Sequence, residues 1–92
     1  MDLSHYDRIV LCAILGPERL PTGKVRHFIL GAEAETAREL RIIQLDGEPG
    51  FYLIRFNVSG VEITDTYHDT VEMAMEQAEF EFGLMPGDWK LP

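Results

Sequence analysis

The chain has 92 residues, a length typical of one domain with a single hydrophobic core. Its apolar fraction of 46% and charged fraction of 26% are those of an average globular protein, which excludes an intrinsically disordered chain. We therefore predict one domain over residues 1–92, with a loose N-terminus at 1–6 and a C-terminal tail at 84–92.

The net charge of −8 is unevenly distributed along the chain. Residues 1–60 carry seven Lys/Arg and eight Asp/Glu, a net charge of −1, whereas residues 61–92 carry Lys90 and eight Asp/Glu, a net charge of −7. Such an acidic half repels a phosphate backbone, so nucleic-acid binding is disfavoured. The acidity serves either solubility or the binding of a basic partner.

The single cysteine, Cys12, lies in the apolar run at 9–15 and is interpreted as a small buried hydrophobic residue in a reducing compartment. That run is shorter than the roughly 18 apolar residues of a membrane span. Asp2 and Asp7 precede it, and acidic residues there are the wrong charge for a signal peptide. We therefore expect a cytoplasmic protein with no membrane partner.

The first half of the chain is predicted to contain three strands. The apolar run at 7–15 favours a strand covered on both faces, although a buried helix has the same pattern. Glycine and proline mark a loop at 16–23, and alternating residues predict a strand at 24–30. Residues 31–36 form a loop or a short helical turn, and a strand is expected at 37–45.

Two hairpins are predicted next. A loop at 46–50 joins the strand at 37–45 to a strand at 51–58, and a Ser59-Gly60 turn leads to a strand at 61–67. Counting across both loops places eight apolar residues on one sheet face: Leu40, Ile42, Tyr52, Ile54, Phe56, Val58, Val61 and Ile63. A second patch on the other face must be covered by the strands at 7–15 and 24–30 or by a partner: Ile43, Leu45, Phe51 and Leu53.

A helix is predicted from about Thr70 to Phe82. Asp69 is the expected N-cap, Glu72 completes a capping-box spacing, and Gly83 fits the left-handed position that ends a helix. The apolar residues at helical spacing form a core stripe: Val71, Ala74, Met75, Ala78 and Phe82. These elements predict an α+β fold, an antiparallel β-meander of four to five strands with one C-terminal helix packed on one face.

Several side chains of the helix and tail are not needed by the core stripe. Four acids form what we call the acidic ridge: Asp69, Glu72, Glu76 and Glu79. Met73 and Phe80 point away from the stripe, and the tail carries Trp89. The ridge is either a solvated face or a surface that meets arginines of a partner. The tail either covers Phe80 or leaves an apolar patch for a second subunit, and we expect partner binding by the ridge together with Met73, Phe80 and Trp89.

Polar residues also gather where the last strand meets the helix, at Asp65, Tyr67 and His68. A carboxylate beside a histidine can orient an imidazole for acid–base catalysis, but no serine or cysteine nucleophile lies at a recognisable spacing. The simpler interpretation is a set of turn and cap residues. The histidines lack metal-site spacing and there is no phosphate-binding glycine fingerprint, so no metal and no cofactor are predicted.

The helical run from Asp69 to Met75 with Ala78, preceded by two strands, resembles the strand–strand–helix segment of HicB-like antitoxins. That resemblance implies a domain that binds a toxin and dimerises. The chain lacks the Pro-Asp pair that follows the first strand of those antitoxins, and it has no recognisable C-terminal DNA-binding helix. Residues 51–83, about a third of the chain, also resemble small uncharacterised bacterial proteins, which implies no function.

We therefore predict a small acidic, non-enzymatic protein-interaction domain. It would bind a protein partner or form a homodimer through its acidic and apolar helix surface. The alternative is a small-molecule-binding or catalytic domain that uses Asp65, Tyr67 and His68.

Overall fold

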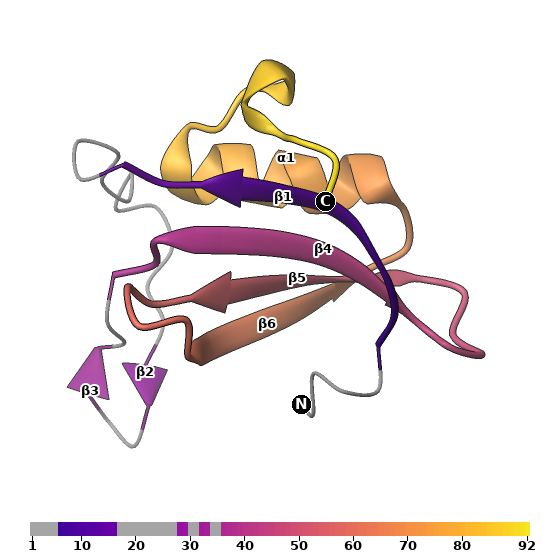
Figure 1. The fold of residues 1–92 in the computed structure, drawn as a ribbon, viewed down its shortest axis with the longest axis horizontal. Helices are drawn as coiled ribbons and strands as arrows, with labels where there is room; N and C mark the ends of the chain where they lie inside the picture. The colour runs from indigo at the N-terminus through magenta and orange to yellow at the C-terminus, as the bar shows by residue number, and fades with distance from the viewer. Residues whose placement is uncertain (1–5, 17–27, 30–31, 34–35) are drawn as a thin grey trace.

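A four-stranded antiparallel sheet with one helix across it forms the centre of the fold (Figure 1). The computed structural model describes residues 6–16, 28–29, 32–33 and 36–92. The sheet has the spatial order β1-β4-β5-β6, with the bounds β1 Tyr6–Ile14, β4 Glu39–Leu45, β5 Phe51–Phe56 and β6 Glu62–His68. A separate pair joins β2 (Phe28–Ile29) to β3 (Ala32–Glu33), and the chain ends with α1 (Val71–Phe82) and the 3-10 turn η2 (Pro86–Asp88).

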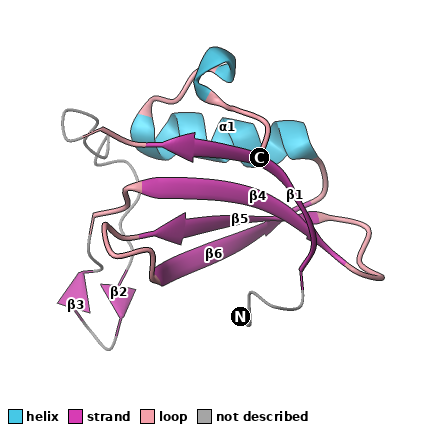
Figure 2. Ribbon diagram, viewed as in Figure 1, coloured by secondary structure: helices cyan, strands magenta, loops and turns pink. Residues whose placement is uncertain are grey.

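The arrangement confirms the predicted α+β class. β4, β5 and β6 form a meander, and β1 pairs with the outer edge of β4, so β1 extends the sheet and does not cover it. α1 packs on one face of the sheet (Figure 2). Within the described residues, no helix has both the length and the apolar character needed to cross a membrane.

The pairing of β4 with β5 differs from the predicted register by one residue. Ile42 lies opposite Leu53, whereas a symmetrical loop at 46–50 would place it opposite Ile54. The reason lies in the turn, because the Glu48 N–H donates to the Leu45 carbonyl at 3.1 Å and closes the turn early. Residues 49–50 then belong to the β5 side, and the symmetrical five-residue loop that we assumed does not form.

This slip makes the predicted single apolar face wrong, because a shift of one residue exchanges the two faces of a strand. The helix-side core instead combines sheet, helix and tail: Ala13, Leu15, Ala37, Leu40, Ile42, Leu53, Ala74, Ala78, Phe82, Leu84 and Trp89. A second buried cluster on the other face consists of Ile43, Ile54 and Phe56, with Ile9, Leu45 and Tyr52 packed against it. The sheet is therefore apolar on both sides.

The turn after β5 is also wider than the predicted Ser59-Gly60 pair. The Asn57 side chain accepts hydrogen bonds from the N–H groups of Ser59 and Val61, at 2.9 and 3.0 Å. This local bonding displaces only the last pair of the ladder, so Phe56 lies opposite Glu62 and not Ile63. The pairs of residues 51–55 keep the register that a two-residue turn gives, with Ile54 opposite Asp65. Val61, and Val58 in the turn, are consequently exposed and do not join a core.

The helix has the predicted core stripe but a different first residue. Thr70 is the N-cap, since its hydroxyl accepts from the Met73 N–H at 3.1 Å, so the prediction of Asp69 at this position was wrong. Gly83 has φ 71° and its N–H donates to the Glu79 carbonyl at 2.8 Å, which confirms the predicted left-handed end.

Other predicted segments are only partly described. The strand at 7–15 is confirmed as β1, and the strand at 37–45 as β4. Of the loop at 16–23 only Gly16 is described, and of the strand at 24–30 only β2. The loop predicted at 31–36 was wrong at Ala32 and Glu33, which form β3, while positions 30–31 and 34–35 lie outside the described residues, as does the predicted loose terminus apart from Tyr6.

An ion pair joins α1 to the sheet inside this core. Arg55 of β5 donates from Nε to Glu81 Oε1 at 2.8 Å and from Nη2 to Glu81 Oε2, and both side chains are only 2% exposed. Gln77 donates to Glu81 Oε2 at 2.7 Å, and Arg55 also donates to the Leu53 carbonyl and to Thr66 Oγ1. Such bonds offset the cost of removing both charges from water.

We expect Arg55→Met to lower the free energy of unfolding by about 3–5 kcal/mol, because it leaves the Glu81 carboxylate buried without its cation. The double variant Arg55→Met/Glu81→Leu should lose less than the single variant, since no charge then remains buried. Urea denaturation of wild type, both singles and the double measures this coupling. Arg41→Met, which removes a partly exposed pair with Glu39 and the contact of Arg41 with the Phe56 ring, is the control and should cost about 1 kcal/mol. Additive losses at 55 and 81 would contradict the prediction.

Candidate functional site

The acidic ridge lies on the outward face of α1. Asp69, Glu72, Glu76 and Glu79 are all exposed. Among the described residues, no lysine or arginine forms an ion pair with the three glutamates. α1 also has no basic residue in its last turn. The ridge is therefore a line of exposed carboxylates that no cation of the described residues neutralises.

Two exposed apolar side chains lie beside the ridge. Met73 and Phe80 are each 46% exposed, and their seven-residue separation places them on the same stripe of the helix. Phe80 stays exposed, so the interpretation in which the tail covers it does not hold. The outward face of α1 thus combines carboxylates with an apolar stripe.

Trp89, also predicted to bind a partner, occupies a different position, because it is only 8% exposed and belongs to the helix-side core. The tail folds back along β1, where Cys12 and Lys90 exchange backbone hydrogen bonds at 2.9 and 2.8 Å. Before this bridge, the Asp88 carboxylate accepts from the Met85 N–H at 2.8 Å and shapes the turn η2.

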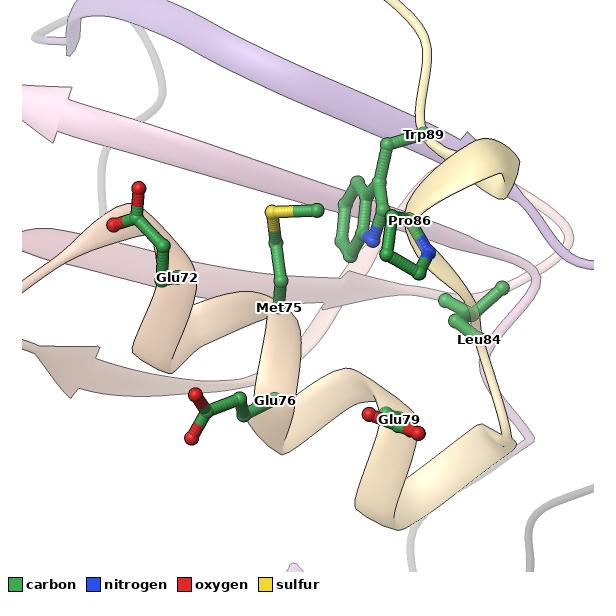
Figure 3. A pocket seen from close by; sticks show the side chains of 7 residues that line it. All are labelled: Glu72, Met75, Glu76, Glu79, Leu84, Pro86 and Trp89. Atoms are coloured by element: carbon green, nitrogen blue, oxygen red, sulfur yellow. The ribbon is translucent and has the colours of Figure 1, made fainter.

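A pocket of about 190 Å³ opens between α1 and this tail (Figure 3). Three ridge residues form its acidic side: Glu72, Glu76 and Glu79. Apolar side chains form the rest of its lining: Met75, Leu84, Pro86 and Trp89. The sequence pattern assigned Met75 to the core stripe and left Leu84 and Pro86 in an unassigned tail, so the pocket was not predicted; the Pro86-Gly-Asp turn was the available signal that the tail reverses.

The Trp89 indole leaves one polar atom in this pocket wall without a bond. Its Nε1 is buried and has no hydrogen-bond partner in the described part of the chain. Figure 3 shows the nitrogen on the ring edge beside Pro86, on the side of Leu84 and away from Met75. Buried donors are nearly always satisfied in folded proteins, so this one requires an explanation.

The three residues of the alternative catalytic site lie on two faces of the sheet. Asp65 is opposite Ile54 and Tyr67 is opposite Tyr52, on the side away from α1. His68 is opposite Phe51, on the side of α1. Alternation along β6 therefore separates the histidine from both proposed partners.

His68 instead belongs to the network around the buried ion pair. Its Nε2 lies 2.7 Å from Thr66 Oγ1, and that hydroxyl accepts from Arg55. Burial is the main cause that lowers the pKa of His68 below its ordinary value, and the Arg55 charge lowers the pKa further, against smaller opposite effects of Glu81 and Asp69. This environment therefore favours the neutral form of the imidazole.

In the described residues, no three His, Cys, Asp or Glu side chains are placed to hold a metal ion. Comparison with protein-family models, curated protein sequences and solved structures finds no match to this chain. The resemblance to HicB-like antitoxins and to small bacterial proteins stays a prediction from the sequence.

The lowered pKa of His68 predicts a specific dependence of stability on pH. As pH falls below the ordinary value of 6.5, the unfolded chain binds a proton before the folded one does. The free energy of unfolding therefore decreases from pH 6.5 down to the folded-state pKa of His68, and His68→Gln should lack this component.

Urea denaturation of both proteins from about pH 7.5 to about pH 5 measures the difference. The other histidines and all carboxylates are present in both proteins, so their contributions cancel. A constant difference over this range would show that His68 takes up its proton equally well in both states.

Proposed function

We propose that this protein is a non-enzymatic interaction domain that binds a basic segment of a partner protein through the outward face of α1. The observation that carries the proposal is the acidic ridge, exposed and without an ion pair among the described residues. Met73 and Phe80 supply apolar area beside it. Aromatic and methionine side chains next to charges are a composition typical of interfaces.

Charge energetics support a basic partner. Glu72 and Glu76 are four residues apart on one face, and like charges at that spacing destabilise a helix by a few tenths of a kcal/mol. Glu79 lies in the last turn of α1, at the negative end of the helix dipole, where an acid is also unfavourable. A cationic partner relieves both repulsions and is attracted to the ridge before contact.

The competing catalytic function has less support. It requires Asp65, Tyr67 and His68 to act on one substrate, and the sheet register places His68 on the opposite face from the other two. The outward face of α1 needs no such rearrangement, because its side chains are already together.

The ridge predicts binding that depends on salt and charge. Affinity for a labelled oligolysine peptide should fall at least about tenfold from 0.1 M to 1 M sodium chloride, where the Debye length shortens from about 10 Å to about 3 Å. Glu72→Lys/Glu76→Lys should abolish binding at every salt concentration, since it replaces two attractive charges by two repulsive ones. Fluorescence anisotropy measures both effects.

The matched control is Asp46→Lys/Asp65→Lys, which makes the same change in net charge at two exposed positions outside α1. It should retain most of the affinity, because only charges near the bound peptide act strongly. Salt-insensitive binding, or equal losses in the two double variants, would contradict a binding site on the ridge.

The ridge also restricts how a second copy can bind. Two ridges face to face would place carboxylates against carboxylates, so a homodimer through the outward face of α1 would have to use Met73 and Phe80. We expect Met73→Ser/Phe80→Ser to convert such a dimer into a monomer, because the variant removes the apolar contact and leaves the acids. Light scattering of both proteins gives the mass; a wild-type monomer, or a dimer that survives the substitutions, would exclude this interface.

A further inference from the structure

The pocket between α1 and the tail has the size of one side chain. Its volume of about 190 Å³ is below the roughly 300–1,000 Å³ of pockets that hold cofactors and drug-sized ligands. It is also open along the helix, since Glu72, Glu76 and Glu79 on its border are exposed. A whole cofactor does not fit, but a single long side chain does.

The chemistry of the lining changes across the pocket. The acidic border belongs to the helix, whereas Leu84 and Pro86 of the tail and Met75 of the helix provide apolar walls. Arginine and lysine have this same division, with a methylene stem that packs on apolar surface and a charged end that stays near water and carboxylates. A purely apolar side chain matches only the apolar walls, and an acidic side chain is repelled by the glutamates.

The unbonded indole N–H of Trp89 adds a second requirement. The nitrogen is buried in the pocket wall and lacks a partner in the described residues, so a ligand that brings a hydrogen-bond acceptor satisfies it. A free amino acid would supply a carboxylate beside three glutamates, which repel it. A backbone carbonyl is a neutral acceptor, and it lies next to every side chain of a polypeptide.

We propose that this pocket receives one arginine or lysine side chain of the partner polypeptide, with its cation at the neighbouring residues Glu76 and Glu79 and an adjacent backbone carbonyl accepting from Trp89 Nε1. This inference rests on the proposed function and names the pocket in which one residue of the partner binds. Such a side chain would run from Leu84 and Pro86 of the tail to the glutamates of the helix, which Figure 3 shows on the two sides of the pocket.

The indole nitrogen is covered in the free protein. Figure 3 shows it on the ring edge beside Pro86, while the Met75 side chain approaches the opposite edge of the ring. A carbonyl that bonds to this nitrogen therefore has to displace the side chains that cover it.

The single tryptophan gives a direct test on the whole chain. Trp89 is the only tryptophan, so the ¹⁵N-labelled protein has one indole N–H signal. Titration with the capped peptide Gly-Gly-Arg-Gly-Gly should move this signal saturably downfield, because the proton enters a hydrogen bond. The same peptide with citrulline in place of arginine keeps the shape, lacks the charge and should leave the signal unmoved.

Variants separate the two halves of the pocket. Trp89→Phe keeps an aromatic ring but removes the donor, and should weaken arginine-peptide binding by about two- to tenfold, the value of one hydrogen bond. Glu76→Gln/Glu79→Gln should weaken it further while the indole shift at saturation persists. Asp46→Asn, a neutralisation in the β4–β5 turn that keeps a turn-forming residue, should leave affinity unchanged.

The outcomes distinguish this inference from the proposed function. Peptide binding that moves helix backbone signals but not the indole signal would refute the pocket and leave the acidic surface intact. Equal affinity of free arginine and the capped peptide would refute the polypeptide ligand. Absence of binding by both the arginine peptide and oligolysine would refute the proposed function itself; since the indole shift is read on wild type, no conclusion depends on whether Trp89→Phe folds.

Discussion

The buried ion pair between Arg55 and Glu81 determines how α1 sits on the sheet. Each charge is costly to bury alone, so α1 is stable only where the carboxylate meets the guanidinium and both find their remaining bonds at Gln77 and Thr66. The apolar stripe alone is less selective, because Ala74 and Ala78 are small and tolerate sliding along the sheet. The ion pair thus fixes one helix position, and that position sets the outward face and the wall of the pocket.

The strands, the helix and most of the β5–β6 pairing could be predicted from local patterns, but the β4–β5 register could not. β4 carries Ile42 and Ile43 side by side, so either register gives it one apolar residue for each face. The choice is made by the Glu48–Leu45 turn, a bond that a pattern does not show. The burial of Arg55 could not be predicted either, since its partner Glu81 is 26 residues away.

The candidate site likewise has a part that could be predicted from local patterns and a part that could not. Helical periodicity alone placed Glu72, Glu76 and Phe80 on the outward face, because exposure on a helix follows from sequence spacing. The burial of Trp89 was not predictable, because it depends on the backbone bridge between Lys90 and Cys12 at the other end of the chain. Local sequence periodicity therefore identifies the exposed face of the helix, whereas the pocket depends on pairing between residues that are far apart in the sequence.

The acidic residues of α1 have two different environments, one on the inner and one on the outer side of the helix. Glu81 faces inward, and its charge is balanced within 2.8 Å by Arg55. Glu72 and Glu76 face outward, and the described chain offers them no cation. A surface optimised for stability alone would alternate positive and negative side chains along α1. This surface keeps a single charge sign beside an open pocket, whose indole donor has no partner among the described residues. We therefore propose this side of α1 as the binding surface, because a partner with a cation and a nearby carbonyl would supply the bonds that these groups lack.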